Sequence, residues 1–251
     1  MTAKTELAKL EEMKRQLAEM AKRDASAEAA TASSPFISLR NGIMTFNGQQ
    51  LANNEIDCVI LAAPIERQYY SGRFDPDNPR PPVCFALSRD PRDMVPSPAS
   101  EDQQHQTCKG CPMDEWGSSE VSTKGKACKE TRRLILLPVD AIESADSVKT
   151  SDIACLRPPV TSVKAFSTYT QTVAAAHSTP LFGVVTKIKV VPDAKTQFKL
   201  SFRAVNPVNL EVMTALMERA DHELAVALAS VNDATPAEEQ ESEPVMASDK
   251  Y

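Results

Sequence analysis

Two apolar spacings divide the chain into predicted helices and strands. Near the N-terminus, apolar residues recur every three or four positions among charged ones, which predicts a helix over residues 3–24. The same spacing predicts a helix over residues 208–230, and another that follows a strand end within residues 160–177. The apolar positions behind these predictions are Leu7, Leu10, Met13, Leu17 and Met20; Phe166, Tyr169, Val173 and Ala176; and Leu210, Met213, Met217, Ala220, Leu224 and Leu228.

Between the helices, apolar runs broken by turn residues predict strands. Asn41-Gly42 and Asn47-Gly48 interrupt short apolar runs, and Asn-Gly favours the positive φ of a tight hairpin turn. Phe198, Leu200 and Phe202 alternate with polar residues and should share one face of a strand. The predicted strands cover residues 36–39, 43–46, 56–65, 132–138, 181–191 and 197–205, and residues 67–82 are interpreted as an ordered loop.

This order of elements predicts an α+β, mostly β protein. We expect an antiparallel β-barrel of the oligonucleotide-binding (OB) type with a zinc-binding insertion and helical extensions, and an antiparallel α+β sandwich is the alternative. The expected organisation is an N-terminal helix at 1–25, a linker at 26–34, an OB-like core at 35–231 with the insertion at about 84–130, and a disordered acidic tail at 232–251.

The insertion lacks apolar periodicity and carries most of the cysteines. In Cys108-Lys109-Gly110-Cys111 the glycine permits a tight turn, so both sulfurs can face one metal ion. With Cys128 and Cys84 they would form a four-sulfur structural zinc site, with His105 as the competitor for the place of Cys84. The alternatives are a redox pair, which usually opens a helix after a strand, and cysteines with no special role.

The other two cysteines and the composition indicate a soluble protein of a reducing compartment. Cys58 and Cys155 lie among apolar neighbours and are read as small buried hydrophobes. No apolar run is long enough to cross a membrane, and the charged N-terminus does not resemble a secretory signal. We therefore expect a cytoplasmic protein without disulfides.

The net charge of −6 is concentrated at the C-terminus. From Asp233 onward there are six acidic residues and one basic residue, a net −5, so the body is close to neutral. The tail should be disordered, and it would act as a solubilising end, compete with nucleic acid for a basic groove, or dock replication or transcription proteins. The apolar stripe of the N-terminal helix needs a partner, either the body or a second copy in a homo-oligomer.

Catalysis finds little support in the sequence. The chain has no phosphate-binding glycine loop, nucleophile elbow or His-Glu-x-x-His helix, and its three histidines are scattered. Paired carboxylates occur in Asp75-Pro76-Asp77 and Asp90-Pro91-Arg92-Asp93, where the prolines indicate surface turns. We expect a protein that is not an enzyme.

Nucleic-acid binding finds more support, because aromatic and basic residues share one third of the chain. Single-stranded nucleic acid needs rings on which bases stack and cations along the phosphate path. The rival interpretation of each ring is ordinary packing. The candidate contacts are Tyr69, Tyr70, Arg73, Phe74, Trp116, Lys124, Lys126, Lys129, Arg132 and Arg133.

The same region resembles a family of bacteriophage single-stranded-DNA-binding proteins. The resemblance is carried by Tyr69-Tyr70-Ser71-Gly72-Arg73-Phe74-Asp75-Pro76-Asp77-Asn78-Pro79, Pro82-Val83-Cys84-Phe85-Ala86, the segment from Cys108-Lys109-Gly110-Cys111-Pro112 to Trp116-Gly117-Ser118, and Gly125-Lys126-Ala127-Cys128-Lys129 with Arg132-Arg133-Leu134. It spans most of residues 36–225. It implies an OB-type barrel, zinc at the four cysteines, and action in phage replication, recombination or transcription in the host cytoplasm.

Two functions from different classes follow. The first is a non-enzymatic, zinc-stabilised single-stranded-DNA-binding protein. The second is a zinc-containing adaptor that recruits a polymerase through protein contacts, which the near-neutral body and the unpartnered N-terminal stripe would suit. A zinc enzyme is disfavoured, because four cysteine ligands leave no position for water.

Overall fold

The computed structural model describes residues 13–15, 20, 36–72, 80–122 and 124–230. By its internal contacts the chain separates into two compact units, Met1–Pro35 and Phe36–Tyr251. In the first unit residues 13–15 and 20 are helical, whereas the rest of the expected N-terminal helix, the linker and the acidic tail lie outside the described residues. Among the residues described, no helix combines the length and the apolar character needed to cross a bilayer.

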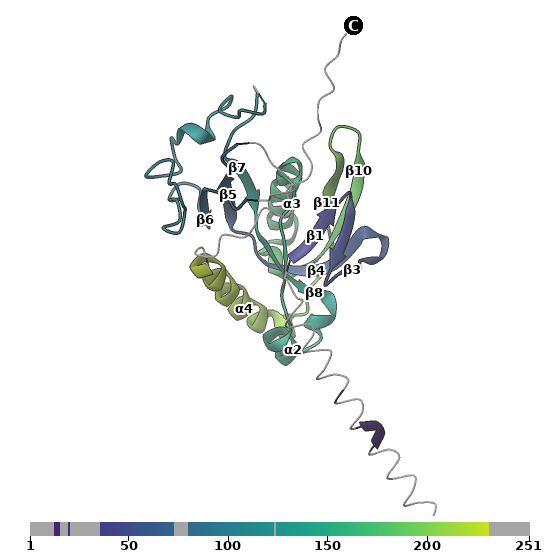
Figure 1. Ribbon diagram of the computed structural model, residues 1–251. Coiled ribbons are helices and arrows are strands. Elements are labelled where there is room, and N and C mark those ends of the chain that lie inside the picture. The colour runs from purple at the N-terminus through teal and green to yellow at the C-terminus, as the bar shows by residue number, and fades with distance from the viewer. Residues whose placement is uncertain (1–12, 16–19, 21–35, 73–79, 123, 231–251) are drawn as a thin grey trace, which may run out of the picture. The chain divides into compact units, whose positions relative to one another are not determined.

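The second unit is α+β and is built on a curled, mixed sheet that resembles half of a barrel (Figure 1). The strand order is β11-β10-β4-β8-β9-β1-β2-β3. Neighbouring strands are antiparallel except β1 and β9, so the expected all-antiparallel arrangement is wrong at this pair. The strands are β1 (Phe36–Arg40), β2 (Ile43–Phe46), β3 (Gln49–Gln50), β4 (Glu55–Ala62), β8 (Leu134–Pro138), β9 (Ala154–Leu156), β10 (Val184–Asp193) and β11 (Gln197–Pro207).

The two Asn-Gly pairs make the hairpin turns that the sequence predicts. Asn41 and Gly42 have φ of 52° and 74° between β1 and β2, and Asn47 and Gly48 have φ of 50° and 73° between β2 and β3. Positive φ at both central residues matches the right-handed twist of the flanking strands. The predicted hairpin of β10 and β11 is also confirmed, with one register shift between Val185 and Thr186.

A second, three-stranded sheet continues from the first and carries the insertion. It consists of β6 (Cys84–Ser88), β5 (Ile65–Tyr69) and β7 (Lys129–Arg132) in the order β6-β5-β7. The pairing of β4 with β8 reaches Ala62 opposite Ile135, and that of β5 with β7 resumes at Ile65 opposite Arg132. The Arg133 amide donates to the Pro64 carbonyl over 3.0 Å at the junction. One long antiparallel ribbon therefore runs through both sheets, and the expectation of a loop was wrong where residues 67–69 complete β5.

Helices cover both faces of the main sheet. Helix α3 (Val160–His177) packs against β11, whereas α4 (Leu210–Ala229) packs against β4 and against the short helix α2 (Ala145–Thr150). The core on the α3 side includes Ile37, Ile60, Leu134, Leu136, Leu156, Phe166, Tyr169, Val173, Ile188, Phe198 and Leu200. The core on the α4 side includes Val59, Leu61, Ile135, Leu137, Val148, Val185, Val212, Ala215, Leu216 and Ala220.

Helix α4 exists where the sequence predicts it, but the face it buries differs. Leu210 is 81% exposed and Met217 is 51% exposed, although both belong to the predicted apolar stripe. The buried positions are Val212, Ala215, Leu216, Ala220, Glu223 and Ala227, of which only Ala220 belongs to the predicted stripe. Three of the six buried residues are alanines, so apolar periodicity in the long side chains alone does not mark this face. In α3, Phe166, Tyr169 and Val173 are buried as predicted, while Ala176 is exposed and the helix begins directly at Val160.

Several short elements were not predicted from the sequence, among them α2, β9 and β6. Helix α2 begins after Ser144, whose side chain accepts a hydrogen bond from the Ser147 amide over 3.1 Å. Strand β9 has only three residues and fills the gap between β8 and β1. Strand β6 lies within the part of the chain assigned to the insertion. Elements of three to six residues contain too few apolar positions to reveal a period.

Candidate metal centre and nucleic-acid interface

Four cysteines that are distant in sequence line one pocket in the insertion. Cys84, Cys108, Cys111 and Cys128 all contribute to its wall. The pocket has a volume of about 20 Å³, which is room for about one water molecule or one ion. The fold therefore brings the four sequence-predicted ligands into the same place.

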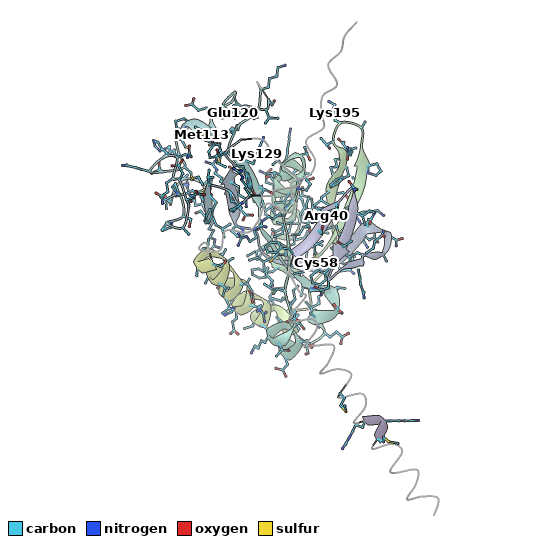
Figure 2. The ribbon with its side chains drawn as sticks, viewed as in Figure 1. Arg40, Cys58, Met113, Glu120, Lys129 and Lys195 are labelled. Atoms are coloured by element: carbon cyan, nitrogen blue, oxygen red, sulfur yellow. The ribbon has the colours of Figure 1, made fainter. Side chains whose placement is uncertain are left out.

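The backbone of the insertion fixes these cysteines from several directions. Cys84 begins β6, whereas the Cys108 amide donates to the Met94 carbonyl over 3.0 Å. The Cys128 amide donates to the Met113 carbonyl over 2.8 Å. Figure 2 labels Met113 at this end of the unit, away from Cys58 in the main sheet.

Little apolar packing supports the insertion. Its buried cluster consists of Ile65, Ala86, Met94 and Cys108, far fewer residues than either core of the main sheet. A bound metal commonly supplies the stability that such a small core lacks.

The donor set of four cysteines suits a soft or borderline metal ion. Within the described part of the chain, no group of three or more His, Cys, Asp or Glu side chains is arranged to hold a metal ion. The six cysteines are free thiols. Four sulfurs on the wall of one pocket nevertheless form the chemistry that zinc prefers in structural sites. His105 lies on the same wall, with Nδ1 2.8 Å from the Thr107 carbonyl, so both candidates for the fourth ligand are present.

The pocket favours neutral thiols in the absence of a metal. Burial raises the pKa of Cys108 to about 11, although the nearby Arg67 guanidinium acts in the opposite direction. Burial likewise raises the pKa of Cys128 to about 12. A metal ion that binds here therefore has to displace protons from the sulfurs.

Arg67 of β5 joins the pocket to its surroundings. Its Nη1 donates to the Cys108 carbonyl over 3.2 Å and lies 3.0 Å from the Asp114 carboxylate. Its Nε and Nη2 donate to one oxygen of Glu130 over 3.0 and 2.7 Å. The Arg67 side chain is only 11% exposed, so its charge is satisfied inside the insertion and is not available to a ligand.

Trp116 is the most exposed aromatic ring among the described residues for which an exposure is given. It is 78% exposed, and the Lys126 Nζ lies 5.5 Å from the centroid of its ring. Lys109 and Lys124 are exposed on the same insertion. A solvent-facing ring beside a cation has the properties that single-stranded nucleic acid requires of a contact surface.

Tyr69 and Tyr70 point to different environments. Tyr69 lines the cysteine pocket and is half-buried. The Tyr70 hydroxyl donates to Gln68 Oε1 over 2.9 Å, and burial raises the pKa of Tyr70 to about 12, with Arg157 opposing the increase. Neither ring is presented to solvent in the way that Trp116 is.

Several of the predicted phosphate contacts are paired within the protein. Lys126 Nζ lies 2.8 Å from Asp114, Arg132 Nη1 lies 3.1 Å from Glu130, and Arg133 pairs with Glu66. Lys124 is exposed, and Lys129 is half-buried in β7. Arg73 and Phe74, together with the Asp75-Pro76-Asp77 turn, lie outside the described residues. Asp90 and Arg92 pair with each other over 2.5 Å in a surface turn, as the proline pattern predicts.

The sequence analysis missed a buried cluster of charges beside the insertion. The Glu66 carboxylate, 3% exposed, accepts from Arg133 over 2.5 Å and from Arg157 over 2.7 Å. Burial alone would raise the pKa of Glu66, but the two guanidinium groups hold it below its usual value. Arg157 also lies over the Phe36 ring, with 4.4 Å between its guanidinium carbon and the ring centroid. The sequence of β5 is Ile-Glu-Arg-Gln-Tyr, so its polar pattern carried no signal that Glu66 is buried.

Comparison with known proteins adds no information about this site. No protein-family model, curated protein or solved structure matches this chain.

Proposed function

We propose that this protein binds single-stranded DNA without catalysing a reaction, and that a structural zinc ion held by four cysteines orders the part of the chain that makes the contact. The single observation that carries the proposal is Trp116, a 78% exposed ring with the Lys126 ammonium beside it. A solvent-exposed tryptophan ring offers a flat surface on which a base can stack.

The contact surface that we propose is narrower than the sequence analysis predicts. Trp116 would stack with a base, and Lys126, Lys124 and Lys109 would attract phosphates. Arg132 and Arg133 are assigned to internal ion pairs instead. Tyr69 is assigned to the wall of the cysteine pocket.

For the metal, we propose zinc bound by Cys84, Cys108, Cys111 and Cys128. Support comes from their shared pocket and from the small apolar cluster beneath it. When bound, zinc would supply a cross-link between β6, the loop around Cys108 and the return to β7. Four sulfur ligands leave no position for a reactive water, which suits a structural ion.

The OB type of the barrel is part of the proposal and not of the observed fold. What supports it is the curl of the main sheet and an insertion that projects from one end of its central ribbon (Figure 1). OB barrels place their ligands on the strand face and on loops that project beside it.

Two fluorescence measurements test the function. Trp116 is the only tryptophan of the chain, so selectively excited tryptophan emission reports on the insertion alone. On protein of determined zinc content, we expect an unlabelled single-stranded oligonucleotide to quench this emission. The anisotropy of a labelled oligonucleotide should show binding that weakens steeply with salt, with duplex competing poorly. Equal affinity for duplex and single strand would contradict the proposal.

An adaptor that recruits a polymerase is the second candidate. Two observations favour it: Met13 and Met20, seven positions apart in the N-terminal unit, are 54% and 51% exposed, and several cations of the insertion are already paired. The role of the acidic tail in docking replication or transcription proteins, and homo-oligomer formation through the N-terminal helix, remain predictions. A zinc-loaded protein that fails to bind oligonucleotides at low salt would favour the adaptor.

A further inference from the structure

An unbroken series of polar contacts runs from the cysteine pocket to the exposed tryptophan. It begins at the Cys108 carbonyl, which accepts from Arg67 Nη1 over 3.2 Å. The same guanidinium lies 3.0 Å from Asp114 Oδ2. Asp114 Oδ1 then accepts from Lys126 Nζ over 2.8 Å. Lys126 in turn lies 5.5 Å from the centroid of the Trp116 ring.

Asp114 is the branch point of this series, because each of its two oxygens holds a different cation. The side chains of Arg67, Asp114 and Lys126 are 11%, 20% and 32% exposed. Charge pairs that are partly withdrawn from water are screened less than pairs at the open surface, so these contacts restrict side-chain motion more strongly.

The backbone around Asp114 depends directly on the cysteine segments. Its amide donates to the Cys111 carbonyl over 2.9 Å, within a short 3-10 helix at Pro112–Asp114. The Cys128 amide donates to the Met113 carbonyl over 2.8 Å. The position of Asp114 is therefore set by the Cys111 and Cys128 segments on either side of it.

The loop that carries Trp116 is closed by the same two segments. The Gly117 amide donates to the Gly125 carbonyl over 2.9 Å, and the Ala127 amide donates to the Ser118 hydroxyl over 2.9 Å. These backbone bonds bring Lys126 next to Trp116, but they do not fix the conformation of the Lys126 side chain. The ion pair with Asp114 holds the ammonium group on the tryptophan side.

From this geometry we propose that Asp114 is a positioning residue: it fixes Lys126 beside Trp116 while the four cysteines are gathered, so metal loading controls the presentation of the stacking ring. The inference rests on the proposed function for its effect on DNA affinity. Its effect on the mobility of Trp116 is independent of DNA. Loss of metal would separate the cysteine segments, move Asp114, and release the lysine and the ring.

For one variant, charge alone and the positioning role predict changes in DNA affinity of opposite direction, so this variant tests the proposal. Asp114→Asn removes a negative charge near the phosphate path, and by charge alone it should strengthen DNA binding. If Asp114 positions Lys126 and Trp116, the same change should weaken binding about fivefold to tenfold. Glu115→Gln is the matched control, because this exposed carboxylate is the next residue and removes the same charge.

The experiment measures three properties of each variant: zinc content, the anisotropy decay of Trp116 without DNA, and oligonucleotide affinity. We expect Asp114→Asn to keep its zinc, to show a more mobile Trp116 ring and to bind more weakly. Glu115→Gln should keep a restrained ring and bind at least as tightly as the wild type. Asp114→Glu, which retains the carboxylate, should restore most of the restraint.

Each result either supports or overturns the positioning role of Asp114. An Asp114→Asn protein with a restrained ring and the affinity of the Glu115→Gln control would overturn the inference. If the Asp114→Asn protein lost its zinc, the test would use the Lys126→Gln variant instead. Lys126 is the member of the series farthest from the cysteines, next to Trp116. A mobile ring in zinc-loaded Lys126→Gln supports the inference, and an unchanged ring overturns it. If the wild type binds no oligonucleotide, the proposed function fails, while the mobility of Trp116 with and without a chelator still tests the positioning role.

Discussion

The guanidinium of Arg133 donates to the carboxylate of Glu66 over 2.5 Å, although 67 positions separate the two residues in sequence. Arg157 completes the cluster from the other side, 2.7 Å from the second carboxylate oxygen. The side chains are 4% to 13% exposed. The contact ties β5 of the second sheet to the residues that precede β8 and follow β9 in the main sheet.

Removing the Glu66 charge should strongly destabilise the second unit. Glu66→Gln removes the carboxylate charge that Arg133 and Arg157 share, and breaking a buried pair by removing one partner costs about 3–5 kcal/mol. Urea unfolding followed by circular dichroism measures the loss. The control is Glu218→Gln, an exposed carboxylate of α4, which should change stability by less than about 0.5 kcal/mol. A similarly small effect at Glu66 would contradict the assigned role.

The contribution of Glu66 should disappear in acid. Its pKa in the folded protein is lowered, because Arg157 and Arg133 together outweigh burial. A lowered folded pKa means that the stabilisation is complete above the unfolded value of about 4.3 and is lost as the pH falls through the folded value. The difference in unfolding free energy between wild type and Glu66→Gln should therefore be constant from about pH 7 to 5 and shrink below about pH 4. Comparing the two proteins at each pH cancels the other carboxylates.

Metal retention should distinguish the two candidates for the fourth ligand. We expect Cys84→Ser to lose its zinc during dialysis against a chelator, whereas His105→Gln keeps it, as measured by elemental analysis. Cys58→Ser is the control, because the Cys58 thiol is buried in the main sheet and donates to the Thr186 carbonyl, a role that a hydroxyl can take. Zinc lost from His105→Gln but kept in Cys84→Ser would reverse the assignment.

Truncating the exposed ring should weaken DNA binding. Stacking of one base on an aromatic side chain is worth about 1–3 kcal/mol, so Trp116→Ala should raise the Kd about 5-fold to 150-fold. Anisotropy with a labelled single-stranded oligonucleotide measures it. Tyr70→Phe should leave the Kd unchanged, because the Tyr70 hydroxyl is engaged with Gln68. Equal losses in the two variants would point to a general loss of structure.

The salt dependence of binding should identify the lysines that meet phosphates. Replacing an exposed lysine that contacts a phosphate reduces the slope of log K against log salt concentration by about 1. We expect this reduction for Lys124→Gln in the insertion and not for Lys164→Gln on α3, both of which remove an exposed positive charge. A slope that is unchanged in Lys124→Gln would move the phosphate path away from this loop.

Local patterns predicted much of the fold. Asn41-Gly42 and the alternation of Phe198, Leu200 and Phe202 depend on neighbours in sequence, and both gave the correct element. The predicted buried face of α4 was wrong at Leu210 and Met217, because the face that packs on the sheet carries alanines, which a pattern of long apolar side chains does not reveal.

The candidate site, too, was predictable from the sequence only where it depends on neighbouring residues. The spacing of Cys108 and Cys111 is local and marks the pocket, whereas the pairing of Lys126 with Asp114 and of Arg133 with Glu66 arises only when the strands align. A basic residue in a sequence therefore indicates a charge, but not whether that charge reaches solvent.

The pairing of β5 with β7 makes the insertion a detachable part of the molecule. Gln68 and Lys129 are opposite one another in this pairing, so the chain departs from the sheet and rejoins it at adjacent points. A tight turn in place of residues 70–128 would close the same ribbon, with Glu66 still between its two arginines. Both cores would keep all their buried residues, and only the partly buried Leu87 would be lost from the margin of the α4-side core. The whole cysteine-bearing segment can therefore be replaced as a unit, in evolution or by design, while the main sheet and its helices keep their structure.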